Sequence, residues 1–212
     1  MESSRELNNR GAVAHAEGDL DDARQAYEAA LAADPGSATA LNNLGFLLAQ
    51  QGRYEEALRL LRESVMRNPE SSLARGNLGM VLAASGSVDE GLEEMHRAVE
   101  LDPENVLVWE SLGRLLVARG RPEAAAGALE QAVRLAPRSA EAWAALGTAL
   151  AMRRDFGSAE EALRRALGLA PEHAGARHQL ALVHAALGNT AEACRELERV
   201  LMLHPADRPA RL

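Results

Sequence analysis

Prolines recur along this chain at a constant spacing of 34 residues, and this period constrains the fold more than any other feature. The series is Pro35, Pro69, Pro103, Pro137, Pro171 and Pro205. A glycine row keeps the same spacing at Gly11, Gly45, Gly79, Gly113 and Gly147, and Ala181 takes the sixth position. Six copies in phase without an insertion predict a stack of similar supersecondary units rather than one mixed core.

Each copy predicts two helices joined by a tight turn. In the second copy, Leu41, Leu44 and Leu48 have the spacing of one apolar helix stripe. Gly52 follows as a C-terminal glycine, and Pro69 ends the second helix because proline cannot continue one. In the fifth copy Arg154 replaces the turn glycine, which would place an arginine where a positive φ is expected.

This pattern resembles the tetratricopeptide repeat (TPR) family, whose repeats carry W-x2-L-G-x2-Y, then A-x3-F and a late proline. The segments WESLGRLL from Trp109 and WAALGTAL from Trp143 fit the first half of that motif. The resemblance covers Ser4 to about Asp207 and implies an all-α fold, a right-handed α-solenoid of six TPR helix-turn-helix repeats. It implies one solenoid domain, 1–207, with a short tail, 208–212, and the repeats 4–37, 38–71, 72–105, 106–139, 140–173 and 174–207.

Charge and composition exclude several classes of partner. A net charge of −8 and a pI of about 5.3 disfavour nucleic acid or an anionic membrane surface as the main partner. The absence of lysine and isoleucine indicates the codon bias of a GC-rich, bacterial genome. A polar N-terminus, a single cysteine and no long apolar window predict a cytoplasmic protein without a disulfide or membrane insertion.

The sequence shows no pattern of catalytic or metal-binding residues. Its six histidines are scattered, and none forms an H-E-x-x-H motif or pairs with a cysteine at ligand spacing. His184 takes a core position and is expected to be buried with its hydrogen bonds satisfied, and Cys194 is expected to be a small packing residue. We therefore predict no enzymatic activity, no metal and no cofactor.

The resemblance places the first helix of each repeat on the concave side of the solenoid, where three asparagines recur. Asn9, Asn43 and Asn77 occupy one repeat position, and an amide can pair with both polar groups of a peptide backbone. This row is similar to the asparagine ladder in the TPR region of O-GlcNAc transferases, and it predicts peptide clamping. The alternative interpretation is that these amides bond between neighbouring helices.

Other groove positions predict how side chains of a partner would be selected. Phe46 and Met80 offer apolar contacts, and Arg114 offers a charge. The cations with which co-chaperone TPR domains bind a terminal carboxylate are missing from the first three repeats. The predicted function is a non-enzymatic scaffold or adaptor that binds a protein partner, through a peptide or helix, in the concave groove.

The two ends of the array differ in sequence. Ser3 and Glu6 predict a capping box for the first helix. The last helix carries Leu201, Met202 and Leu203, which predict a homodimer contact, a docking site or a truncated chain, unless neighbouring charged residues solvate this end. Two alternative functions follow, a self-associating scaffold joined through the C-terminal repeat and a substrate-recruiting or regulatory module of an enzyme such as a glycosyltransferase.

Overall fold

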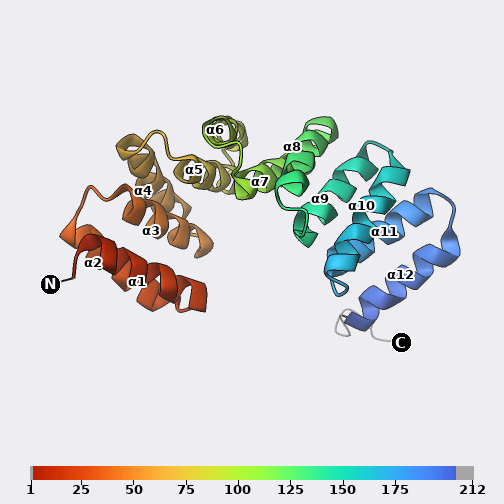
Figure 1. Cartoon of the computed structure of the whole chain (residues 1–212), viewed down its shortest axis with the longest axis horizontal. Coiled ribbons are helices and arrows are strands. Elements are labelled where there is room, and N and C mark those ends of the chain that lie inside the picture. The colour runs from red at the N-terminus through yellow and green to blue at the C-terminus, as the bar shows by residue number, and fades with distance from the viewer. Residues whose placement is uncertain (1, 204–212) are drawn as a thin grey trace. The chain divides into compact units, whose positions relative to one another are not determined.

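The computed structural model describes residues 2–203, and this range contains twelve helices and no strand (Figure 1). The helices are α1 (Ser4–Glu17), α2 (Leu20–Ala33), α3 (Ala38–Gln50), α4 (Tyr54–Arg67), α5 (Ser72–Ala84), α6 (Val88–Leu101), α7 (Val106–Ala118), α8 (Pro122–Leu135), α9 (Ala140–Met152), α10 (Phe156–Leu169), α11 (Ala174–Ala186) and α12 (Thr190–Leu203). The predicted all-α class is confirmed. The predicted tail, 208–212, and Pro205 lie outside the described residues.

The chain divides into two compact units, an N-terminal unit (Met1–Val108) and a C-terminal unit (Trp109–Leu212). In both units, odd-numbered and even-numbered helices alternate and pack as hairpins, such as α3 with α4 and α9 with α10. We call the odd-numbered helices first helices and the even-numbered helices second helices. The first helices begin at residues 4, 38, 72, 106, 140 and 174, which are the starts of the repeats expected from the sequence.

Turn chemistry follows the sequence pattern closely. The turn residues Gly18, Gly52, Gly86, Gly120 and Gly188 all have positive φ, and in the fifth turn Arg154 adopts φ 64°. At the start of α1 the predicted capping box is confirmed, because the Glu6 N–H donates to Ser3 Oγ and the Ser3 N–H donates to a Glu6 carboxylate oxygen at 2.7 Å. These hydrogen bonds lower the pKa of Glu6 below its ordinary value.

Replacing Arg154 by glycine is expected to raise the free energy of unfolding by about 0.5–1 kcal/mol, because a non-glycine residue is strained at positive φ. The measurement is the urea midpoint of the variant against the parent protein. The control is Arg153→Gly, since Arg153 has φ −74° and gains nothing from glycine there. An unchanged midpoint for Arg154→Gly would contradict the expected strain.

Glycine in the first helices allows the second helix of the same repeat to approach closely. A Cβ built on Gly45 would lie 2.9 Å from Leu61 Cγ, and one on Gly147 would lie 2.5 Å from Leu163 Cγ. Real Cβ atoms do not approach other atoms this closely, so these positions require glycine. The residues that pack at this contact in the first five repeats are at most 1% exposed, and they are Tyr27, Leu61, Met95, Leu129 and Leu163.

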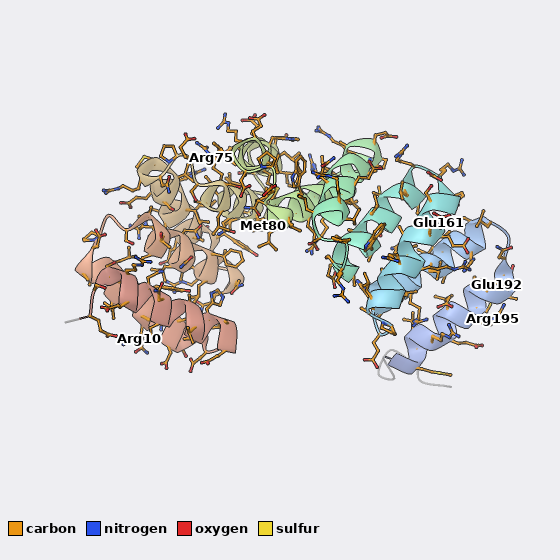
Figure 2. All side chains as sticks on the ribbon, viewed as in Figure 1. Arg10, Arg75, Met80, Glu161, Glu192 and Arg195 are labelled. Carbon is orange, nitrogen blue, oxygen red and sulfur yellow. The ribbon has the colours of Figure 1, made fainter. Side chains whose placement is uncertain are left out.

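A largely buried ion pair recurs 102 residues apart, once in each unit. Arg75 on α5 donates to Glu94 on α6 at 2.7 Å and to the Pro69 carbonyl at 2.9 Å, and both charged side chains are at most 17% exposed (Figure 2 labels Arg75). Arg177, Glu196 and Pro171 repeat these contacts in the C-terminal unit. At the same repeat position Trp143 donates to the Pro137 carbonyl, so arginine and tryptophan fill one structural role.

Candidate functional site

The three predicted asparagines lie on α1, α3 and α5, in different environments. Asn9 is exposed, Asn43 is half-buried and Asn77 is buried. Asn77 donates its amide to Asn42 Oδ1 at 2.9 Å, and Asn43 donates to Asn8 Oδ1 at 3.0 Å. The two links are joined on α3, where Asn42 donates to Asn43 Oδ1 at 3.1 Å.

We call this chain of four amides (Asn77, Asn42, Asn43 and Asn8) the asparagine relay. It connects α5 to α3 and α3 to α1. These are bonds between neighbouring helices, as the alternative interpretation of the asparagines predicts, and Asn9 takes no part in them. Asn43 is the least buried member, and its amide can still form one further bond at each end. Sequence reasoning missed Asn8 and Asn42, although both interhelical links join asparagines 35 residues apart.

Phe46 lies one turn beyond Asn43 and is half-buried beside His15 of α1, with 6.3 Å between ring centroids. His15 also meets the edge of buried Tyr27 and lies 2.7 Å from the amide oxygen of Gln50. These contacts join α1, α2 and α3 around one partly exposed aromatic cluster.

Further apolar surface lies on the first helices of the N-terminal unit. Leu73 on α5 and Leu107 on α7 take the same repeat position and are 47% and 67% exposed. Met80 on α5 is half-exposed. Asn43, Phe46, Leu73 and Met80 therefore all have surface available on the unit that contains the relay.

Arg114 belongs to the C-terminal unit, together with Glu110 and Glu141. It is exposed on α7, one turn after the half-buried Glu110. Burial raises the pKa of Glu110, Arg114 opposes this effect, and Glu141 on α9 adds to it. These three side chains form a small charged group around the predicted Arg114.

At the C-terminal end, Leu201 and Met202 are exposed, and the side chain of Leu203 lies outside the described part of the chain. Leu197 is 39% exposed, whereas its five equivalents are at most 1% exposed, because no described helix follows α12 to cover it. Cys194 lies on α12 and is exposed, so the prediction that it packs inside is wrong.

His184 is buried as predicted, but its hydrogen bonds are not satisfied. The side chain is 5% exposed, and Nδ1 is buried without a hydrogen-bond partner among the described residues. Residues 2–203 contain no group of three or more His, Cys, Asp or Glu side chains placed to hold a metal ion. No helix in the same range has the length and apolar character needed to cross a membrane.

Comparisons with known proteins agree on the repeat. Residues 14–78 match a tetratricopeptide repeat model, and residues 102–211, more than half of the chain, match the model described as the cytochrome c-type biogenesis protein H TPR domain. No curated protein matches the chain.

Several solved structures share the fold. A chain of the APC/C hetero-tetramer Cut9–Hcn1 is 19% identical with a TM-score of 0.85, over 97% of this chain and 41% of its own length. MamA from Desulfovibrio magneticus RS-1 is 23% identical with a TM-score of 0.72, over 81% of this chain and 97% of its own. YrrB, described as a TPR protein with an unusual peptide-binding site, is 22% identical with a TM-score of 0.70, over 87% of this chain and 95% of its own. With twelve helices in hairpins, a 34-residue period and these matches, the chain belongs to the tetratricopeptide repeat family.

Proposed function

We propose that this protein is a non-enzymatic adaptor that binds an extended segment of a partner protein on the first helices of its N-terminal unit. Tetratricopeptide repeats mediate protein–protein interaction, and their first helices supply an extended binding surface. The observation that carries the proposal is the asparagine relay, which fixes the half-exposed Asn43 amide beside Phe46.

The relay prepares Asn43 for main-chain recognition. Its Nδ2 already donates to Asn8 and its Oδ1 already accepts from Asn42, so the amide cannot rotate without breaking both bonds. The remaining N–H of Nδ2 would donate to a peptide C=O, and the remaining lone pair of Oδ1 would accept from a peptide N–H. Because the amide is already fixed, binding would cost no side-chain conformational entropy at Asn43. The exposed Asn9, one repeat earlier, would hold the next part of the backbone.

Apolar side chains of the partner would lie against Phe46, Met80 and Leu73, which are all partly exposed on the same unit. The charged group of the C-terminal unit, Glu110, Arg114 and Glu141, would select charged side chains separately. The likeness of residues 102–211 to the TPR domain of a cytochrome c-type biogenesis protein supports a role in assembling another protein.

Selection of binders from a random peptide library, followed by calorimetric titration, tests this proposal. Asn9→Ala and Phe46→Ala are each expected to weaken binding about tenfold, which is the effect of about 1.4 kcal/mol. Methylation of a single backbone nitrogen in the peptide should weaken binding to a similar degree, because Asn43 and Asn9 would recognise the main chain.

Asn42→Ala tests the relay itself. Asn42 is buried in the relay and donates to Asn43 Oδ1, so its loss is expected to lower the melting temperature and to weaken binding, while Asn9 and Phe46 still contribute. If the selected peptides bind equally well to the parent protein, Asn9→Ala and Phe46→Ala, the first helices of this unit are not the binding surface.

Self-association through α12 is a second candidate, because the exposed Leu197 and Leu201 occupy the side that a following repeat would cover. The other end is closed by polar residues, since Arg10 on α1 stands where every later repeat has a leucine. Head-to-tail stacking would bury Arg10, so two copies would have to meet through their α12 helices. Light scattering of the same samples separates the candidates, because a mass that stays monomeric over a wide concentration range removes this one.

A further inference from the structure

The fifth and sixth repeats place the same side chains around the space between their second helices as the second and third repeats do. Five positions are identical at an offset of 102 residues, and the pairs are Arg62 and Arg164, Leu78 and Leu180, Glu90 and Glu192, Glu94 and Glu196, and Arg97 and Arg199. The space in the N-terminal unit therefore serves as an internal reference for the space in the C-terminal unit. Neither space belongs to the proposed peptide surface.

In the N-terminal unit an ion pair spans this space. Arg62 on α4 lies 3.6 Å from Glu90 on α6, which joins two successive second helices. In the C-terminal unit the equivalent residues pair within their own helices instead. Arg164 pairs with Glu160 at 2.6 Å on α10, and Glu192 pairs with Arg195 at 2.5 Å on α12.

A pocket of about 350 Å³ lies where the cross-helix pair is not formed. Its lining residues are Arg164 of α10, Leu180 and His184 of α11, and Glu192, Arg195, Glu196 and Arg199 of α12. Figure 2 labels Glu192 and Arg195 on α12.

Two differences from the reference repeat make this pocket more polar and more positive. His184 stands where the third repeat has Leu82, and Arg195 stands where it has Glu93. His184 is 5% exposed and its ring forms part of the pocket wall, whereas Nδ1 itself is closed to the pocket. The imidazole therefore gives the pocket a more polar wall than a leucine would.

The charged groups define the chemistry of that ligand. The pocket is lined by three arginines and two glutamates, whereas the equivalent reference positions carry two arginines and three glutamates. Glu196 is already held between Arg177 and Arg199, at 2.7 and 3.0 Å, so its carboxylate is neutralised from both sides. Guanidinium groups bind phosphate and carboxylate oxygens by paired hydrogen bonds.

We propose that the pocket between α10, α11 and α12 binds a small oxyanion, a phosphate or a carboxylate, through Arg195 and Arg164, with His184 in the pocket wall. Arg195 is 64% exposed and can leave Glu192 to cover the ligand, and Leu180 gives the pocket an apolar floor. Arg199 remains paired with Glu196 and adds positive charge to the wall of the pocket.

Titration with inorganic phosphate and, separately, with succinate tests this proposal at constant pH and ionic strength, with sodium chloride as the reference salt. The ring signals of His184 in NMR spectra are expected to shift in a saturable way with at least one of the two probes, and the melting temperature is expected to rise with the same probe. A response to phosphate alone assigns a phosphate site, and a response to succinate alone assigns a carboxylate site.

Arg195→Glu restores the residue type of the reference repeat at an exposed position and is expected to weaken the response at least tenfold. Combining it with Arg164→Gln should abolish the melting shift. Glu93→Arg is the matched control, because it adds an arginine at the reference position, where the Arg62–Glu90 pair spans the space, and should create no second site. Unmoved His184 signals with both probes, or a parent-like response from Arg195→Glu, would overturn the proposal.

Discussion

Gly147→Ala is expected to lower the free energy of unfolding by about 1–2 kcal/mol, although alanine is the better helix former. The added Cβ would lie 2.5 Å from Leu163 Cγ and 3.2 Å from the Ala159 carbonyl oxygen, and Leu163 has no exposed surface into which it could move. Overpacking of this kind costs about 1–3 kcal/mol, which exceeds the gain of up to about 1 kcal/mol from replacing a helical glycine. Urea midpoints measure the difference.

The control lies on the neighbouring helix of the same unit. Gly127 is exposed on α8, and a Cβ built there meets no atom within 4 Å. Gly127→Ala is therefore expected to raise the free energy of unfolding by about 0.5–1 kcal/mol. Two glycine-to-alanine changes with opposite effects on the free energy of unfolding isolate the contribution of packing. A gain in stability at both positions would refute the close contact at Gly147.

Arg75→Ala is expected to lower the free energy of unfolding by about 2–3 kcal/mol. The change removes the hydrogen bonds to Glu94 and to the Pro69 carbonyl, and it leaves Glu94 largely buried with only the bond from Arg97. Hydrogen bonds to charged groups contribute about 1.5–3 kcal/mol each, and the remaining bond from Arg97 to Glu94 offsets part of the loss. Urea midpoints again provide the measurement.

Two comparison variants show whether burial causes this loss. Arg67→Ala removes the exposed pair with Glu63 and should cost less than about 1 kcal/mol. The double change Arg75→Trp and Glu94→Ala introduces the residues that the fifth repeat has at Trp143 and Ala162, so it should recover most of the stability lost in Arg75→Ala. Equal costs for Arg67→Ala and Arg75→Ala would mean that burial of the pair is irrelevant.

Much of this fold could be predicted because the period fixes local structure six times over. Each turn residue and the capping box at Ser3 are local features, and Arg154 at positive φ followed from its place in the turn series. Local chemistry of this kind depends on residues close in sequence, which a single chain displays directly.

The asparagine relay, the charge pair at Arg75 and the unsatisfied His184 depend on which side chains meet between helices. Asn42 and Asn43 are adjacent in sequence, but they point to different neighbours because successive residues are about 100° apart around a helix. Cys194 was misplaced for another reason. The period treats the sixth repeat like the others, whereas no described helix follows α12 to bury its outer face.

The asparagine relay also has a direction. Donation runs from α5 through α3 to α1, from Asn77 to Asn42, from Asn42 to Asn43 and from Asn43 to Asn8, so the amide dipoles are arranged head to tail. Such a chain is cooperative, because reversing one amide breaks its bonds on both sides. In an array whose stability is otherwise a sum of contacts between neighbours, the relay ties the opening of the first repeat to that of the third, so fraying at the N-terminal end is penalised across three repeats at once.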